Sequence, residues 1–596
     1  MKRKALPLLA AVLGLALVDP PAARAQDARA KLHALIDEEW EFRLREDPLF
    51  ATSTGDHRYD DRLPSVTLAD EARRAGFRRS LFERLEAIDP AALSDTDRVS
   101  HAMFRWELGD AIQGFEQNRH LLPLTSDSGF HTELARLPDE VPLATTRNYE
   151  NYIARLRAIP AYVGQWIGLL REALRRGYTL PRVALQGYER GIAAHVLDDP
   201  EKTKFYGPFR EFPPGVPEGD RNRLRAAGRT AVRDGAIPGF RAFLDFVTRE
   251  YVPGARETTG ASSLPQGAAL YRHLVRHFTT VDLTPERIHE IGLKEVARIR
   301  AEMDGVIRQT GFAGDFAAFL KFLRTDPRFY AKTADELLQQ AAWIAKRMDG
   351  KLPSLFGRLP RQPYGVEPVP DDIAPKYTAG RYVGAPLDSP RAGRYWVNTY
   401  NLPSRALYAL EALSLHEAVP GHHLQVALSK ELTDLPKFRR YSYVDAFGEG
   451  WGLYSERLGL EAGFYGDPYN NFGRLTYEMW RACRLVVDTG LHSKGWSRQQ
   501  ALDYLASHTA LSIHEVTTET DRYISWPGQA LAYKMGELKI RELRQLAEKT
   551  LGPRFDVRAF HDAVLSNGTV TLPVLEERIG RFIRAGQAPA VSRGRS

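Results

Sequence analysis

The chain has 596 residues, of which 43% are hydrophobic and 26% charged, a balance typical of a globular protein with enough apolar material for a large core. Its net charge of +7 is spread among many acidic residues, and no basic run marks a surface for nucleic acid. We therefore expect no nucleic-acid partner.

The N-terminus has the pattern of an export signal. Basic MKRK precedes the apolar stretch ALPLLAAVLGLALV, and Ala23-Arg24-Ala25 has the form of a cleavage site. The apolar stretch is too short to span a bilayer and no longer one follows, so we expect residues 1–25 to be a secretory signal peptide and the mature chain to lack an integral membrane segment. Because the only cysteine is Cys483, we expect neither a lipid anchor nor an internal disulfide. The prediction is secretion across the inner membrane to the periplasm.

Residues 26–350 read as a helical N-terminal lobe. Thr284, followed by proline, predicts the start of a helix, and Gly311 predicts its end. Apolar residues between them recur at helical period. Capping-box patterns begin at Thr333 and Ser497.

The composition of the sequence changes after residue 350, where prolines become frequent. Six prolines crowd an irregular connection that ends in RYWVNTY, residues 394–400. The aromatic and β-branched alternation of this run predicts a short strand. We expect it to be an edge strand along which a peptide lies, with Asn398 reaching the cleft.

The segment HEAVPGHH, which begins at His416, resembles the zinc-helix signature HExxH with two residues inserted. In a regular helix the residue six positions after His416 is rotated by about 240° and points away. Pro420 lacks the N–H that would bond to the His416 carbonyl, and Gly421 permits unusual backbone angles. A kink or bulge here is predicted to bring His422 beside His416, with His423 as the alternative if the helix stays nearly straight.

Two acidic residues downstream complete a metal constellation. In VDAFGEGWGLYSE, Glu449 and Glu456 lie two turns apart on one helical face. We expect His416, His422 and Glu449 to bind Zn²⁺, which a His/His/Glu set favours. Glu456 is predicted to hold the free ring nitrogen of a ligating histidine, and Glu417 to act as general base.

A further helix carries Arg484, Asp488 and His492 on one face. Arg484 is predicted to grip a substrate carboxylate, and His492 to assist the oxyanion or donate a proton. Asp488 reads as an ion-pair partner of the arginine with a structural role. His273 and His277 have metal-like spacing but no evident acidic partner, so we interpret them as structural.

Three motifs carry a resemblance to the bacterial domain-of-unknown-function 885 family, namely HEAVPGHHLQ (416–425), EGWGLYSE (449–456) and PGQALAYKMG (527–536). The resemblance spans most of the mature chain, and the family name implies no activity. More distantly, the chain is similar to helical gluzincin peptidases, the thimet oligopeptidase and thermostable carboxypeptidase families, which share the phasing of the two glutamates. That likeness implies that Tyr533 binds the oxyanion, while the Pro-Gly insertion leaves the second ligand open.

We therefore expect a mainly α, bilobed, metallopeptidase-like architecture with a deep cleft and a small β element before the metal-binding helix. Residues 351–596 would form the metal-binding catalytic lobe, either separate from the first lobe or continuous with it. The predicted function is an exported zinc metallopeptidase acting on short peptides. The alternatives are a zinc hydrolase of a non-peptide amide or ester, and a binding or scaffold protein with a degenerate metal site.

Overall fold

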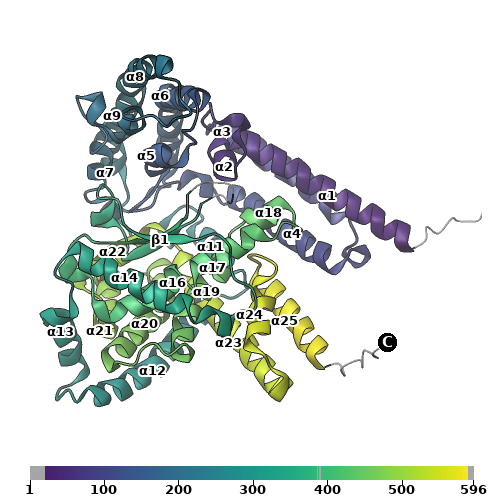
Figure 1. The fold of residues 1–596 in the computed structure, drawn as a ribbon, viewed down its shortest axis with the longest axis vertical. Helices are drawn as coiled ribbons and strands as arrows, with labels where there is room; N and C mark the ends of the chain where they lie inside the picture. Colours follow the sequence, from purple (N-terminus) through teal and green to yellow (C-terminus); the bar gives the residue numbers. More distant parts are fainter. Residues whose placement is uncertain (1–20, 386, 388–390, 588–596) are drawn as a thin grey trace, which may run out of the picture.

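The computed structural model describes residues 21–385, 387 and 391–587 (Figure 1). The described chain is mainly helical, as predicted, with a single three-stranded sheet. The predicted signal peptide, residues 1–25, lies outside the described residues except for 21–25, which begin helix α1. Within the described part, no helix is both long and apolar enough to cross a membrane.

The helices before residue 350 are α1 (Pro21–Glu46), α2 (Pro48–Ser53), α3 (Leu68–Glu86), α4 (Asp95–Glu116), α5 (Phe130–Glu140), α6 (Thr146–Arg176), α7 (Glu189–Ala193), α8 (Glu218–Ala231), α9 (Ile237–Phe246), α10 (Val252–Gly254), α11 (Gly267–Thr279), α12 (Pro285–Thr310), α13 (Phe316–Thr325) and α14 (Ala334–Asp349). Those after it are α15 (Leu352–Leu355), α16 (Leu410–Glu417), α17 (His422–Glu431), α18 (Lys437–Tyr441), α19 (Asp445–Glu461), α20 (Pro468–Ser493), α21 (Arg498–His508), α22 (Ile513–Ser525), α23 (Ala532–Leu551), α24 (Val557–Leu565) and α25 (Leu572–Gln587).

The helix ends that the sequence marked are present. The Thr284 side chain accepts the backbone N–H of Arg287 at the start of α12, and Gly311 ends this helix in the left-handed conformation. Thr333 caps α14 in the same way, and Ser497 forms a full capping box at the start of α21. These local predictions are confirmed because each depends only on side chains within one turn of the helix end.

Two hydrophobic cores organise the helices. The smaller core runs from Val66 to Ala255 and is built mainly by α5, α6, α8 and α9. The larger core runs from Ala28 to Ile583 and joins α1, α3 and α4 to the C-terminal helices. The larger core therefore extends across the predicted lobe boundary near residue 350.

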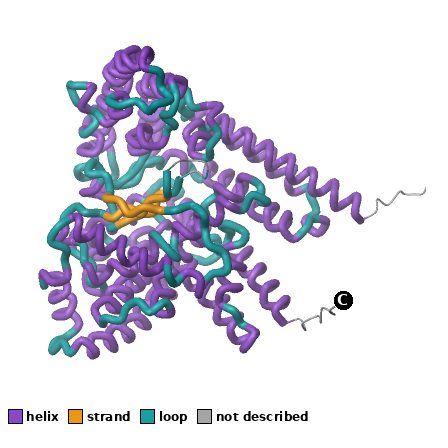
Figure 2. Tube along the Cα trace, viewed as in Figure 1, coloured by secondary structure: helices purple, strands orange, loops and turns teal. Residues whose placement is uncertain are grey.

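The sheet consists of β1 (Tyr364–Pro368), β2 (Gly380–Val383) and β3 (Gly393–Val397) in the order β1-β3-β2. β3 pairs with β1 in parallel and with β2 in antiparallel orientation. Figure 2 shows the sheet between the helices around α5–α9 and those around α16 and α20. The run RYWVNTY thus forms the central strand, and the prediction that it is an edge strand is wrong. β1 and β2 are the two edge strands, which alternation in one short segment could not reveal.

Helices α12, α20 and α23 meet around a buried charge. The Nζ of Lys534 on α23 lies 3.0 Å from carboxylate oxygens of Glu295 on α12 and Glu478 on α20, and 2.9 Å from Glu537. The lysine side chain is fully buried. Such a network holds the three helices in one relative arrangement because each of its charges depends on its partners.

We expect Lys534→Met to destabilise the protein by about 1–3 kcal/mol, because Glu295, Glu478 and Glu537 lose one buried cation while Arg298 and Arg541 still pair with them. Urea unfolding followed by circular dichroism measures this loss. Lys294→Met, at an exposed position of α12, is the matched control and should change the unfolding free energy little. Equal stabilities of the two variants would contradict a structural role for the Lys534 network.

Candidate metal centre

The helix that carries the first part of the metal motif ends at Glu417, and α17 begins at His422. The connection, residues 418–421, contains Pro420, which has no N–H to donate to the preceding turn. The Val419–Pro420 peptide bond is cis. The kink or bulge that the sequence predicted is thus a complete break between two helices.

Gly421 allows the two helices to approach closely at this break. A Cβ atom on Gly421 would lie 1.8 Å from the carbonyl oxygen of His416, a distance no side chain can adopt. The indole N–H of Trp451 donates to the Pro420 carbonyl at 2.8 Å and ties the connection to α19. The start of α17 is therefore held directly beside the end of α16.

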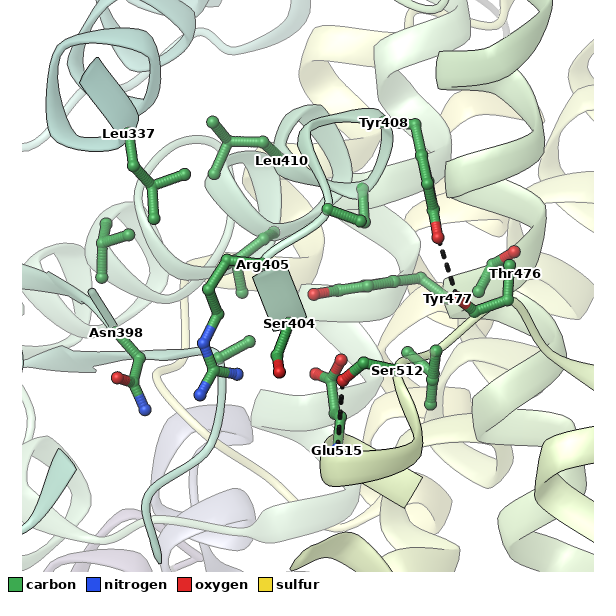
Figure 3. A pocket seen from close by; sticks show the side chains of 17 residues that line it. Leu337, Asn398, Ser404, Arg405, Tyr408, Leu410, Thr476, Tyr477, Ser512 and Glu515 are labelled. Atoms are coloured by element: carbon green, nitrogen blue, oxygen red, sulfur yellow. Dashed lines mark hydrogen bonds between the residues drawn. The ribbon is translucent and has the colours of Figure 1, made fainter. Parts of the chain in front are cut away.

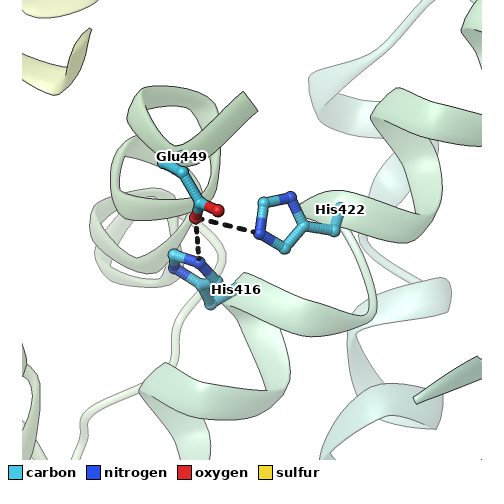
Figure 4. A group of neighbouring side chains, drawn as sticks. All are labelled: His416, His422 and Glu449. Atoms are coloured by element: carbon cyan, nitrogen blue, oxygen red, sulfur yellow. Dashed lines mark ion pairs between the residues drawn. The ribbon is translucent and has the colours of Figure 1, made fainter. Parts of the chain in front are cut away.

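This arrangement brings His416, His422 and Glu449 together (Figure 4). The Nε2 atoms of His416 and His422 lie 3.4 and 3.3 Å from the same oxygen, Oε2 of Glu449. The two rings are nearly perpendicular, at 86°, with centroids 4.7 Å apart. One donor atom from each residue lies within 4.8 Å of the others, so the three side chains can hold a metal ion. Two imidazoles and one carboxylate are a donor set that fits Zn²⁺.

His423 takes no part in this group. Its Nδ1 lies 3.1 Å from the Tyr382 hydroxyl, and its ring packs 4.5 Å from that of Tyr364. Burial lowers the pKa of His423 to about 4, so the ring stays neutral among these tyrosines. Of the two candidates for second ligand, the geometry selects His422.

Glu456 orients the first histidine. Nδ1 of His416 lies 2.8 Å from Oε1 of Glu456, which also lies 3.1 Å from Nη2 of Arg481. When the ring is neutral and Nδ1–H donates to this carboxylate, the Nε2 lone pair is left on the side of Glu449, where it can bind a metal ion. The two glutamates act from the same face of α19, as their spacing predicted.

The same carboxylates control protonation in the absence of metal. Burial lowers the pKa of His416, but hydrogen bonds to Glu449 and Glu456 outweigh it and raise this pKa to about 10. For Glu449, burial raises the pKa, but the two imidazoles outweigh it and hold the pKa well below its usual range. Protons therefore compete with a metal ion for His416 throughout the neutral range.

A cavity of about 600 Å³ opens at this group. Glu417 lies in its wall, where Oε2 accepts the backbone N–H of Tyr382 at 2.8 Å. Tyr382 belongs to β2, so this bond places the outer edge of β2 in the cavity wall. The cavity lining includes Gly380, Arg381, Tyr382, Gly384, His416, Glu417, His422, Tyr443, Glu449, Arg481, Arg484, Glu519, Arg522, Gln529 and Tyr533.

Tyr533 stands beside the first histidine. Its ring stacks on that of His416, with centroids 6.2 Å apart and an interplanar angle of 24°. The Tyr533 hydroxyl oxygen accepts from Nη2 of Arg522 at 3.1 Å and from Nε2 of Gln529 at 3.4 Å. Because two donors occupy its oxygen, the hydroxyl proton is free to point into the cavity.

Close contact between α19 and α23 sets the position of this tyrosine. A Cβ atom on Gly536 would lie 1.8 Å from the carbonyl oxygen of Ala446, and one on Gly450 would lie 2.5 Å from the Gly536 backbone. The glycines of the second and third motifs therefore face one another where the helices cross. This contact fixes Tyr533 on α23 relative to Glu449 on α19.

Arg484 lines the cavity, but its guanidinium is largely committed to other side chains. Nη2 pairs with Glu519 at 3.0 Å and Nε donates to the Tyr523 hydroxyl at 2.8 Å. The guanidinium carbon lies 4.1 Å from the Trp480 ring centre and 4.2 Å from that of Tyr533. Only 1% of the Arg484 surface is exposed. The side chain is therefore held in the cavity wall as a fixed positive charge, and it is poorly placed for the predicted role of binding a substrate carboxylate.

The structure does not bring His492 to the site. Nδ1 of His492 accepts the backbone N–H of Ala261 at 2.9 Å, and Nε2 lies 3.0 Å from the carbonyl of Tyr523. Burial lowers its pKa to about 3, and both nitrogens are occupied by backbone groups. The proton-donor role predicted for His492 is therefore corrected to a structural one.

Asp488 accepts from the Tyr271 hydroxyl at 2.5 Å and from the backbone N–H of Gly528. The expected ion pair between Asp488 and Arg484 is therefore wrong, because Arg484 pairs with Glu519, although the contacts of Asp488 agree with a structural role.

Asn398 does not line the cavity at the metal group. It borders a small separate cavity of about 30 Å³ (Figure 3). Its Nδ2 donates to the carbonyls of Ala374, Tyr377 and Thr378 at 3.0–3.1 Å. The expectation that Asn398 reaches the cleft is corrected: it fixes the segment that leads into β2.

The histidines read as structural have a partner that the sequence did not reveal. His277 Nδ1 lies 2.8 Å from Oδ2 of Asp110 on α4, and His273 Nδ1 lies 3.2 Å from Oε1 of Gln113. These contacts join α11 to α4, so their role is structural.

Several cavity residues were not predicted from the sequence, among them four that contact the metal group or the residues that hold it. Tyr443 donates to Oε1 of Glu449 at 3.3 Å, and its ring centre lies 6.5 Å from that of His422. Glu456 is paired with Arg481, and the Tyr533 hydroxyl accepts from Arg522 and Gln529. A signal existed for Gln529, which lies one helical turn before Tyr533 in the third motif. The others contact the site only through tertiary packing.

The comparisons place the chain in a family. The family described as "Bacterial protein of unknown function (DUF885)" matches residues 48–579, so the chain belongs to this family. Its fold is similar to that in "The crystal structure of the putative lipoprotein from Colwellia psychrerythraea", with a TM-score of 0.87, 28% identity, and coverage of 94% of this chain and 99% of that one. A structure titled as a putative lipoprotein of unknown function from Shewanella oneidensis shares the fold, with a TM-score of 0.65, 18% identity and the same coverage. No curated protein matches the chain.

We expect His416→Ala, His422→Ala and Glu449→Ala each to lower zinc affinity by at least tenfold, because each removes one of three ligands. Isothermal titration of metal-stripped protein measures this affinity. His423→Ala is the matched control and should bind zinc as the native protein does. Loss of binding in the His423 variant, with binding kept in the His422 variant, would reverse the assignment.

Zinc affinity should continue to rise between pH 7 and pH 9, by up to about tenfold per unit, because His416 loses its proton only near pH 10. In Glu456→Gln the pKa of His416 falls, so the rise should level off at lower pH. Competition with a chelator of known affinity at each pH measures both curves. Superimposable curves for the two proteins would contradict control of His416 by Glu456.

Proposed function

We propose that the protein is an exported zinc-dependent metallopeptidase that hydrolyses short peptides. The observation that carries this proposal is the meeting of His416, His422 and Glu449 at a cavity whose wall also holds Glu417 and Tyr533. Three ligands, a carboxylate base and a hydroxyl donor are the groups that hydrolysis of an amide requires.

The chain supplies a base next to the metal ligands. Zn²⁺, when bound, would act as a Lewis acid toward the substrate carbonyl and would lower the pKa of a water molecule in the site. Glu417 directly follows His416, and its carboxylate faces the cavity. It takes a proton from the attacking water and returns it to the leaving amine.

Tyr533 supplies a donor for the negative charge that develops on the carbonyl oxygen. Arg522 and Gln529 donate hydrogen bonds to the Tyr533 oxygen, so the position of the phenol is fixed before the substrate binds. A donor that needs no reorganisation stabilises the transition state more than the ground state.

The edge strand β2 supplies a surface for a peptide backbone. Residues 380–382 and Gly384 line the cavity, and an extended peptide can bind such an edge by main-chain hydrogen bonds, although the N–H of Tyr382 is already donated to Glu417. This arrangement supports a cleft of the metallopeptidase type. The likeness to helical gluzincins stays a prediction.

Export is part of the proposal. The fold is similar to two proteins titled "putative lipoprotein", and this is compatible with the secretory signal that the N-terminus predicts. A periplasmic location stays a prediction, and nutrient peptides and cell-wall stem peptides are the candidate substrates there.

Zinc-loaded protein should cleave members of a pooled peptide library, and Glu417→Gln should lower kcat by about 10²–10⁴-fold with its zinc content unchanged. Mass spectrometry of the products and metal analysis of each protein measure these effects. Glu367→Gln, at an exposed position of β1, is the matched control and should keep full activity.

Three outcomes separate the alternatives. Zinc binding without cleavage of any peptide would favour hydrolysis of a non-peptide amide or ester. Failure to bind zinc, with no effect of Glu417→Gln on any phenotype, would favour a binding or scaffold role. Full peptide cleavage by Glu417→Gln would reject Glu417 as the base.

A further inference from the structure

The arginines of the cavity outnumber the carboxylates that pair with them. Arg481 pairs with Glu456, whose carboxylate also contacts Nδ1 of His416. Arg484 and Arg522 lie 3.0 and 3.1 Å from the same oxygen, Oε2 of Glu519. One carboxylate cannot neutralise two guanidinium groups, so this part of the wall keeps an excess positive charge.

Arg381 adds a further cation to the same wall. It lies on β2, is partly exposed and lines the cavity. Its guanidinium carbon is 5.3 Å from the ring centre of Tyr377, and it makes no hydrogen bond or ion pair with any residue that the structure describes. Asp127 acts on it electrostatically but forms no ion pair with it.

Asp127 acts electrostatically on Arg381 and Arg522, and it accepts a hydrogen bond from the Thr125 hydroxyl at 2.7 Å. Other acids near the cavity contact other groups. Glu449 faces the histidines, and Glu417 accepts the N–H of Tyr382. Asp445 is hydrogen-bonded to Gln529. Glu515, outside the lining, interacts with Arg481 and Arg484, but burial raises its pKa to about 7, so it is only partly charged at neutral pH.

A wall of this charge favours an anionic ligand. Buried cations without a counter-ion are costly, and an anion that enters the cavity relieves that cost. Guanidinium groups match the planar fork of a carboxylate in particular. Arg381 has all its donors available for such a ligand.

The excess charge lies close to the predicted scissile bond. Nη2 of Arg522 is 3.1 Å from the Tyr533 hydroxyl, and the Tyr533 ring stacks on His416. Arg381 interacts electrostatically with both Arg522 and Tyr533. An extended peptide advances roughly 3.3 Å per residue, so an anion held here is one or two residues from the carbonyl under attack.

We propose that Arg381, with the charge of Arg522 behind it, binds the terminal carboxylate of the substrate, and that the protein therefore removes one or two residues from the carboxyl end of short peptides. This inference rests on the proposed peptidase function. Water is the co-substrate: the amide C–N bond breaks, the carbonyl carbon gains the hydroxyl oxygen, and the leaving nitrogen gains the proton.

Three acetylated peptides of equal length test this assignment. One ends in a free carboxylate, one ends in a carboxamide, and one ends in a glutamate whose terminus is amidated. We expect the zinc-loaded native protein to cleave the free acid with a kcat/KM about 10- to 100-fold above that of both amides. Arg381→Met should remove this preference, and Arg394→Met, on neighbouring β3, should leave it intact.

Each other outcome overturns a defined part of the proposal. Equal cleavage of acid and amide by the native protein would reject the anion subsite. Equal cleavage of the free acid and the amidated glutamate peptide would show that the subsite binds a side-chain carboxylate and would reject the terminal assignment. A preference that survives in Arg381→Met would reject Arg381 as its source.

A binding measurement separates this proposal from the proposed function. Zinc-loaded Glu417→Gln should bind the free acid at least tenfold more tightly than the carboxamide, and the added substitution Arg381→Met should abolish the difference. This result would stand even if no peptide were cleaved. Equal binding of acid and amide would overturn the subsite whether or not the native protein is a peptidase.

Discussion

The structure depends on one close backbone contact, that between Gly421 and the carbonyl of His416. Where a straight helix would turn the second histidine away, the chain stops at Glu417 and restarts at His422, with the two helix ends in contact. Only a residue without a side chain fits at this point. The two inserted residues interrupt the zinc helix, but the break they cause places the His422 imidazole beside the same Glu449 carboxylate that His416 faces.

Around this contact, the charged and polar side chains form two shells, one that can bind the metal ion and one that contacts the first. The inner shell is the His/His/Glu group, and the outer shell consists of Glu456 with Arg481 and Tyr533 with Arg522. The outer groups set the tautomer of one ligand and the direction of one hydroxyl, so they determine which atoms face the cavity. The glycines where α19 crosses α23 connect the shells, since they fix the distance between Glu449 and Tyr533.

The sequence predicted most of what depends on local geometry. Helix caps, the helices on both sides of Pro420, and the shared face of Glu449 and Glu456 follow from spacing within a few turns. What it missed depends on tertiary contact. The strand 393–397 has the composition of any short strand, and only its neighbours make it central. His492 occupies a helical face that points to Ala261 and not to the cavity, and periodicity cannot identify what a buried face touches. Arg381 sits in an irregular, proline-rich stretch where no pattern indicates a site.

Anomalous diffraction at the zinc edge, on crystals of zinc-loaded protein, tests the central claim most directly. We expect one strong peak within about 2.0–2.2 Å of Nε2 of His416, Nε2 of His422 and a carboxylate oxygen of Glu449. A peak that involves His423 in place of His422, or no peak between α16 and α19, would contradict this claim.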